Sequence, residues 1–338
     1  MEFFGLTLFG SLTGGALLAV AAVIFAVGLV LIIKGGDWFV DSASWFAEAT
    51  GIPKFVVGAT VVSFATTLPE LLVSVRAALN GSAQLAIGNA VGSVTANTTL
   101  IMGVSLVAMA GVVSRKSFSF KGGLFMASVI GLTLLSLGGS LPSWSVFILW
   151  AIFLAFMISN LIEGKKAAES DDIDSYEKKE IPSKVLFFVI GTAAIVFGAE
   201  FLVSSGKTIA SGIGISETII GFTVIALGTS LPELVTTLTA IRKKESSLSV
   251  GNIIGANIID ATLILPLCAV LDGKALPVER INLVLDFPIC ITACAIVVVP
   301  TIIQGKFKKW QGVALLTVYV IYMTLLILKE TGVLTLVA

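Results

Sequence analysis

The two halves of this chain repeat one another at a constant offset of 163 positions. The segment Leu68-Pro69-Glu70-Leu71 recurs as Leu231-Pro232-Glu233-Leu234, and Gly88-Asn89 recurs as Gly251-Asn252, with no insertion between the two matches. Chance does not preserve one offset over about sixty residues. The chain is therefore expected to fold as two copies of one structural unit.

Long apolar runs place both copies in a membrane. The runs at 16–33, 185–203 and 310–328, and the run at 263–270 with its flanks, match the roughly 20 apolar residues that a helix needs to cross a bilayer. The chain is 57% hydrophobic and only 12% charged, with a mean hydropathy of +1.05, which is more apolar surface than a water-soluble enzyme can bury. We predict an all-α, polytopic membrane protein of about ten transmembrane helices. No basic region precedes the first run and no small-residue cleavage site follows it, so we expect a retained span.

An odd number of spans in each half would reverse the second half in the membrane. With about five helices per half, the two halves form an inverted repeat, an architecture typical of transporters, whose substrate site lies at the midplane between the repeats. The one long polar stretch divides the chain near its middle. We therefore expect a first transmembrane half at 1–162, a linker at 163–184 and a second transmembrane half at 185–338.

Basic residues gather in alternate loops, which predicts the orientation. By the positive-inside rule these loops face the cytoplasm. The central linker then lies inside the cell, and the N-terminus lies outside. The loops outside contain Lys207, Lys274 and Lys329. The expected location is the cell membrane. The cytoplasmic clusters contain Arg115, Lys116, Lys121, Lys165, Lys166, Arg242, Lys243, Lys244, Lys306, Lys308 and Lys309.

In each half a span runs into a small, polar segment that contains proline, at 63–70 and at 226–233. Proline lacks an amide donor and collides with the carbonyl four residues earlier, so each helix should kink or break there. Irregular backbone at membrane depth is tolerated where it is packed in protein or lines a cavity. Freed carbonyls beside threonine and serine hydroxyls are suitable ligands for a hard cation.

An acidic residue follows each break. Glu70 and Glu233 are costly inside a membrane, and such residues normally mark an ion path or a proton relay. Asn97 and Asp260 each follow their glutamate by 27 positions and are the informative mismatch between the halves. Four carboxylates at one site would repel one another severely, and an asparagine in one of the four positions relieves this repulsion.

The expected site contains oxygen ligands only. The chain has no histidine, whereas zinc and copper sites usually recruit histidine or cysteine. Calcium, sodium, magnesium and protons remain as candidates. Magnesium sheds its water reluctantly, so a dehydrated protein cage favours calcium, and sodium can compete for the same oxygens. A site that is empty and highly charged should not switch from facing one side of the membrane to facing the other. This favours exchange of one ion for another. We expect no cofactor, no nucleic acid and no protein partner.

These motifs resemble the sodium/calcium exchanger family of the cation/calcium antiporter superfamily, in its compact prokaryotic form. The resemblance covers nearly the whole chain and rests on residues 66–70 with 88–97 and on residues 228–233 with 251–260. It implies a secondary antiporter that exchanges calcium for sodium by alternating access. It also implies that calcium is bound by Glu70, Glu233, Thr66 and Thr229, with carbonyls near Ser63 and Ala226. Sodium would be bound by the same glutamates with Ser93 and neighbouring hydroxyls such as Thr67 and Ser230. By the same resemblance, Asn97 and Asp260 line the centre.

Departures from the family pattern keep a second coupling ion open. Ala256 stands where the family usually has a serine, and Thr67 and Ala65 replace the usual serine and glycine. Because Ala256 offers no hydroxyl for sodium, a calcium antiporter coupled to protons is the alternative. A cation channel is more distant, since a channel would assemble its ring of acids from several subunits. An intramembrane hydrolase would need a nucleophile with its base, or a metal-binding histidine motif, so we predict that the chain is not an enzyme.

Three further acidic residues attract attention. Asp286 precedes Phe287-Pro288 and is expected to cap the helix that begins there. Asp37 and Glu200 occupy matching positions in the two halves. We expect this pair to gate the protein or to hold the halves together.

Overall fold

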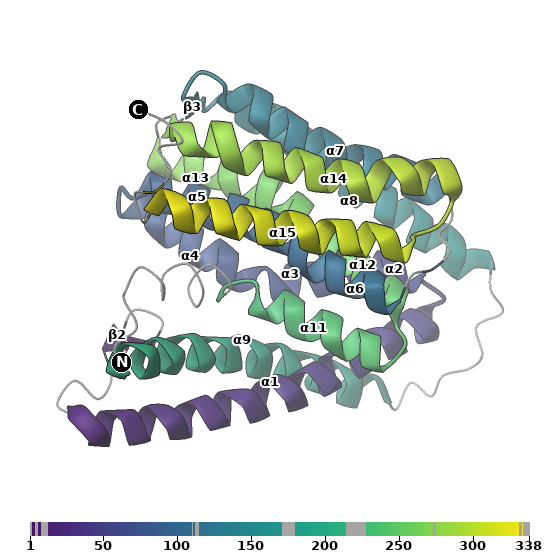
Figure 1. Cartoon of the computed structure of the whole chain (residues 1–338). Helices are drawn as coiled ribbons and strands as arrows, with labels where there is room; N and C mark the ends of the chain where they lie inside the picture. The colour runs from purple at the N-terminus through teal and green to yellow at the C-terminus, as the bar shows by residue number, and fades with distance from the viewer. Residues whose placement is uncertain are drawn as a thin grey trace.

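The computed structural model describes residues 2–3, 6–7, 13–109, 111, 115–170, 180–213, 228–273, 275–330 and 333, and it shows a bundle of long helices lying side by side (Figure 1). The first half contains α1 (Gly14–Thr50), α2 (Lys54–Val57), η1 (Gly58–Val62), α3 (Ser63–Thr66), α4 (Leu68–Leu79), α5 (Ala83–Ala96), η2 (Asn97–Ile101), α6 (Met102–Ala108), α7 (Arg115–Ser136) and α8 (Ser145–Ser170). The second half contains α9 (Ile181–Gly212), α11 (Leu231–Arg242), α12 (Ser246–Ile259), η5 (Asp260–Ile264), α13 (Leu265–Asp272), η6 (Asn282–Asp286), α14 (Phe287–Gln304) and α15 (Lys309–Glu330). The elements labelled η are π-helical, with a wider turn than an α-helix.

Short strands complete the described structure. The two-residue strands β1 (Glu2–Phe3) and β2 (Leu6–Thr7) pair with each other, and β3 (Ser140–Leu141) pairs antiparallel with β4 (Leu276–Pro277). The second pair joins the loop after α7 to the loop after α13, so it ties the two halves together at one end of the bundle.

The prediction of an all-α membrane protein is confirmed. Among the described residues, 8 helices are long and apolar enough to cross a membrane, and the segments Lys54–Thr66 and Leu68–Leu79, with a bend of 46° between them, make a ninth if they count as one span. The expected crossing that contains the second proline motif includes residues 214–227, which lie outside the described residues. Only its later part, α11, belongs to the described structure.

The internal repeat is visible in the helix boundaries. The bounds of α11, α12 and η5 each lie 163 positions after those of α4, α5 and η2. The halves also run in opposite directions. Gly111, shortly after α6, lies beside Ser246, the first residue of α12, because a Cβ atom on Gly111 would lie 4.0 Å from Oγ of Ser246. Helix α12 therefore starts where its counterpart α5–α6 finishes, as an inverted repeat requires.

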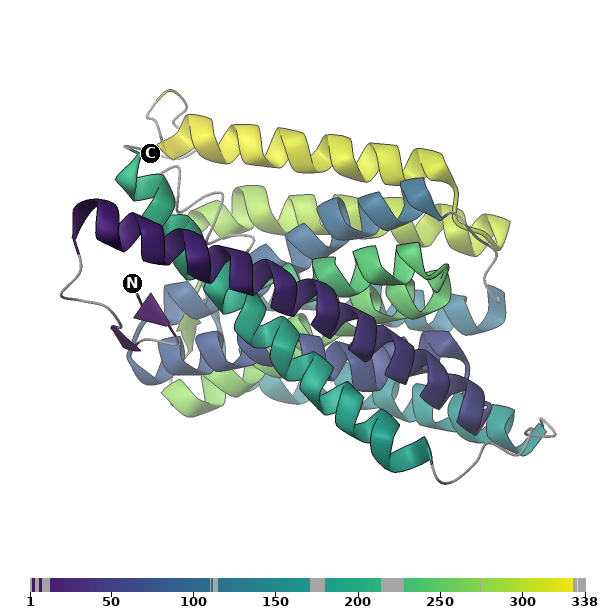
Figure 2. The same cartoon turned by 90° about the horizontal axis from the view of Figure 1, so that it is seen from below.

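Two related helices lie along one flank of the bundle, and the core lies away from them. Helices α1 and α9 pack closely on each other (Figures 1 and 2). A Cβ atom on Gly191 would lie 2.7 Å from the amide nitrogen of Phe39, and one on Gly35 would lie 2.7 Å from the Cβ of Ala194, so glycine is required at both positions. The most buried spans are Gln84–Ala108 and Ser246–Asp272, and these two carry the second motif of each half.

Candidate cation site

The two glutamates lie in equivalent positions at helix breaks. Thr67 separates α3 from α4, and its φ and ψ of −84° and 2° nearly equal those of Ser230 before α11, −84° and 6°. Proline occupies the first turn of both α4 and α11, where an N–H group has no acceptor within the same helix. Glu70 lies in the first turn of α4, and Glu233 lies in the first turn of α11. The unpaired N–H groups of a helix N-terminus favour a negative charge there.

Four polar side chains of the site are completely buried. Glu70, Asn97, Glu233 and Asp260 have no exposed surface. Among the described residues, both carboxylate oxygens of Glu70 and of Asp260 have no hydrogen-bond partner, and the same is true of both side-chain polar atoms of Asn97 and of Oε2 of Glu233. Buried polar atoms without partners cost about 1–3 kcal/mol each, and more when they are charged. Binding of a cation or of protons would offset this cost.

The carboxylates come from both halves and interact. Glu70 lies close enough to Glu233 and Asp260 for their charges to repel. The hydroxyl of Thr67 lies 3.4 Å from Oε1 of Glu233, across the boundary between the halves. The repeated glutamates thus meet at the boundary between the two halves.

Threonine and asparagine side chains cross between the halves in a symmetric pattern. Thr66 donates to Oδ1 of Asn252 over 3.1 Å, and its repeat mate Thr229 donates to Oδ1 of Asn89 over 3.2 Å. Ser93 also lies 3.4 Å from Thr229. Our sequence analysis did not include Asn89 and Asn252 among the site residues. Their repetition in the two Gly-Asn pairs was the signal that could have identified them.

Helix α12 approaches the first helix break closely. A Cβ atom on Gly251 would lie 2.3 Å from the carbonyl oxygen of Phe55, and one on Gly255 would lie 2.5 Å from Oγ of Ser63. Side chains at either position would push α12 away from α2, η1 and α3. The small residues of the second motif therefore position Asp260 against the break that precedes Glu70.

The central pair of side chains stands on π-helical backbone. Asn97 is the first residue of η2, and Asp260 is the first residue of η5. A π turn inserts one extra residue into a helix and is frequent at functional sites. No feature of the sequence had indicated these turns. They change the direction in which the two side chains leave their helices.

The backbone at the first break offers fewer free oxygens than we expected. The carbonyl of Ser63 accepts hydrogen bonds from the amide of Thr67, at 2.9 Å, and from its hydroxyl, at 2.6 Å. Because Pro69 has no N–H group, the carbonyl of Ala65 lacks its usual helical donor. The expected contribution of Ala226 falls outside the described residues. Ser230 is buried, and its hydroxyl has no partner within the described part of the chain.

Carboxylates alone do not form a ready metal cage. In the described ranges, no three histidine, cysteine, aspartate or glutamate side chains converge on one point. A cation held between Glu70 and Glu233 would therefore need hydroxyl or carbonyl oxygens as well, for which Thr66 and Thr67, both buried, are the nearest source. Calcium accepts such a mixed set of oxygen ligands.

The expectation that Asp286 caps α14 is wrong. Its backbone is helical, with φ and ψ of −66° and −51°, and it makes no side-chain capping bond, because η6 continues directly into α14. Its carboxylate instead accepts hydrogen bonds from Asn282, at 2.7 Å, and from Tyr322, at 2.9 Å. Asp286 joins α14 to α15.

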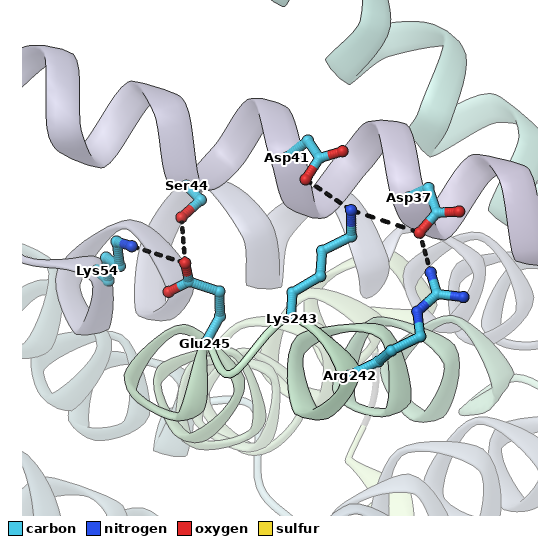
Figure 3. Close-up of polar contacts among 7 residues, drawn as sticks. All are labelled: Asp37, Asp41, Ser44, Lys54, Arg242, Lys243 and Glu245. Atoms are coloured by element: carbon cyan, nitrogen blue, oxygen red, sulfur yellow. Dashed lines mark hydrogen bonds and ion pairs between the residues drawn. The ribbon is translucent and has the colours of Figure 1, made fainter.

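Asp37 joins the two halves. Its carboxylate pairs with Arg242 and lies 3.5 Å from Nζ of Lys243, which lies 2.7 Å from Asp41 (Figure 3). Asp37 and Asp41 belong to α1, whereas the two basic residues end α11 and begin the following turn. Figure 3 also shows Glu245, whose carboxylate accepts a hydrogen bond from Ser44 at 2.8 Å. For Asp37 the expected role in holding the halves together is confirmed.

Known proteins share this fold over almost the whole chain. The family model described as sodium/calcium exchanger protein matches residues 20–161 and 183–328. The sodium/calcium exchanger MaX1 of Methanosarcina acetivorans is 29% identical over 92% of this chain and 99% of its own length, and the membrane protein MJ0091 of Methanocaldococcus jannaschii is 30% identical over 88% and 95%. A solved structure of the sodium-calcium exchanger NCX_Mj superposes with a TM-score of 0.80 at 27% identity, and the match covers 91% of this chain and 99% of that one. The chain belongs to the sodium/calcium exchanger family.

Proposed function

We propose that this protein is a secondary antiporter that exchanges calcium for sodium by alternating access. The observation that carries the proposal is the pair of buried glutamates from opposite halves, Glu70 and Glu233, whose carboxylates meet at two helix breaks with oxygens left unpaired among the described residues. The relatives MaX1 and NCX_Mj are named as sodium/calcium exchangers, and this supports the same pair of ions for this chain.

Calcium binds between the two glutamates in this proposal. Thr66 and Thr229 supply hydroxyl oxygens, and the backbone near Ser63 and Ala226 supplies carbonyls. Sodium uses the same glutamates together with Ser93, Thr67 and Ser230, while Asn97 and Asp260 complete the centre. Because every ligand is an oxygen and the site is buried, the cation must be dehydrated to enter, which favours calcium and sodium over magnesium.

Orientation and domain organisation follow from the charge distribution. The loops rich in lysine and arginine lie at the end of the bundle where Lys54 meets Glu245, and we place this end in the cytoplasm by the positive-inside rule. The N-terminus then lies outside the cell. Residues 1–162 and 185–338 act as the two moving halves, and residues 163–184 link them on the cytoplasmic side.

The test is calcium uptake into proteoliposomes that contain the purified protein, driven by an outward sodium gradient. We expect uptake in the wild type and a loss of more than about tenfold in Glu70→Gln and in Glu233→Gln, since each removes a charge that the ion needs. Glu169→Gln is the matched control, because Glu169 is an exposed acid that pairs with Lys165 at the surface. Equal loss in the control, or unchanged uptake in both site variants, would refute the assignment of the site.

Proton coupling is the competing activity, and Ala256 is the feature that favours it, because it removes one hydroxyl from the sodium ligands. Uptake driven by a pH gradient but not by sodium would assign the chain to that class. Uptake that requires no counter-ion gradient and does not saturate would indicate a channel.

A further inference from the structure

One buried polar pair that joins the two halves next to the site has no polar counterpart at the position related to it by the repeat. Asn257, on α12, donates a hydrogen bond from its Nδ2 to Oγ1 of Thr98 over 2.9 Å, and both side chains are completely buried. Thr98 donates its own proton to the carbonyl of Val94 over 2.7 Å. The hydroxyl oxygen is therefore free to act as the acceptor for Asn257. Thr98 directly follows Asn97 and lies in the same π segment, η2.

The residues at the equivalent positions of the repeat are apolar. The repeat places Val94 at the position of Asn257 and Ala261 at the position of Thr98, and both belong to the hydrophobic core. The polar pair therefore lies beside Asn97 and has no equivalent beside Asp260. Burying a polar pair where an apolar pair also fits brings little net stability, so stability does not explain its presence on one side.

The chemistry of the two central side chains explains the difference. A carboxylate such as that of Asp260 presents an oxygen to a cation in either of its flipped orientations. A carboxamide such as that of Asn97 has one oxygen and one NH₂ group, and the NH₂ group repels a cation. Asn97 therefore needs a more closely defined backbone than Asp260, and the bond to Thr98 holds the backbone of η2 against α12.

We propose that Asn257 is a positioning residue for cation binding, which acts through Thr98 to direct the amide oxygen of Asn97 toward the ion. This role rests on the proposed function of the site. It also identifies the residue that lets the site work with three carboxylates and one amide, because the amide replaces a carboxylate oxygen only when it is correctly oriented.

The repeat itself supplies the test variant. The double substitution Thr98→Ala with Asn257→Val copies the residues Ala261 and Val94, which occupy the equivalent positions of the repeat in the hydrophobic core, so it should fold. Calcium binding is measured on the full-length protein in lipid nanodiscs, and maximal uptake is measured in proteoliposomes. We expect calcium affinity to fall by about tenfold, comparable to the loss of one buried hydrogen bond, with maximal uptake and thermal stability within about twofold and ~2 °C of the wild type.

A second background separates orientation from general packing. In Asn97→Asp the side chain presents an oxygen in either orientation, so the same double substitution should change calcium affinity by less than about threefold. An equal loss of affinity in both backgrounds, or unchanged affinity in the Asn97 background, would overturn the proposal. If the double variant does not fold, the single variants Thr98→Val and Thr98→Ser test the role of the hydroxyl instead. Serine should keep the wild-type affinity and valine should lose it, and equal affinities would overturn the role of the hydroxyl. A wild-type protein that binds no calcium would instead refute the proposed function, and this role with it.

Discussion

The ion pairs between α1 and the turn after α11 allow a quantitative test of how the two halves are held together. We consider Lys243→Met, which removes the contacts of Lys243 with Asp37 and Asp41 and keeps most of the apolar stem. The side chain of Lys243 is 24% exposed, and the side chains of Asp37 and Asp41 are 27% and 58% exposed. Ion pairs at this level of exposure contribute up to about 1 kcal/mol each. We therefore expect a loss of up to about 2 kcal/mol, which lowers the melting temperature by up to roughly 3 °C in a chain of this size.

The assay is thermal unfolding of the purified protein, with Asp41→Asn and the double variant completing a double-mutant cycle. The coupling between Lys243 and Asp41 should be about 0.5 kcal/mol at low salt and should shrink at 1 M salt, where screening acts over about 3 Å. Charge exchange, Lys243→Asp with Asp41→Lys, should recover part of the loss. Lys309→Met, at an exposed lysine at the same end of the bundle, is the control. Strictly additive single substitutions, or a coupling that does not respond to salt, would refute the reasoning.

Two further predictions concern buried contacts. The side chain of Lys121 is 2% exposed and lies 2.9 Å from Glu163, whose side chain is 33% exposed. Glu163→Gln should therefore cost about 2 kcal/mol of stability by leaving a buried ammonium unpaired, whereas Lys121→Met should cost less than about 1 kcal/mol. Thermal unfolding of both variants measures the two losses, and a larger loss in Lys121→Met would contradict this account. Gly255→Ala should cost more than about 2 kcal/mol, because its Cβ would lie 2.5 Å from Oγ of Ser63. Gly138→Ala, where a Cβ meets no described atom within 4 Å, is the control, and equal melting temperatures of these two variants would refute the close approach.

Sequence alone predicted the features that depend on local pattern. The constant offset between the halves predicted the matching bounds of α4 with α11 and of α5 with α12, and proline predicted the break before Glu70. Asp286 shows where such reasoning fails. The segment Asp286-Phe287-Pro288 has the composition of a helix start, but η6 runs through it, and the carboxylate is used by Asn282 and Tyr322 instead.

The sequence offered candidate residues for the site but not its geometry. The side-chain partners across the halves, such as Thr66 with Asn252, depend on how α12 packs against α3. This packing is decided by close contacts between the glycines of α12 and residues far from them in the chain. The π turns at Asn97 and Asp260 were also beyond sequence reasoning. Their cost relative to an α-helix is recovered through tertiary contacts, and no residue type marks them.

The composition of the site also explains why exchange is favoured over simple leakage in the proposed mechanism. Three carboxylates without a cation would place unpaired charge in a low-dielectric interior, and the effective penalty is several kcal/mol for each ion. The empty protein should therefore change its access state slowly, while a calcium ion or sodium ions offset most of the charge and allow the change. A fourth carboxylate in place of Asn97 would deepen the penalty and bind calcium too tightly for release. The amide keeps the oxygen and removes the charge, and so it sets the balance between holding the ion and letting it go.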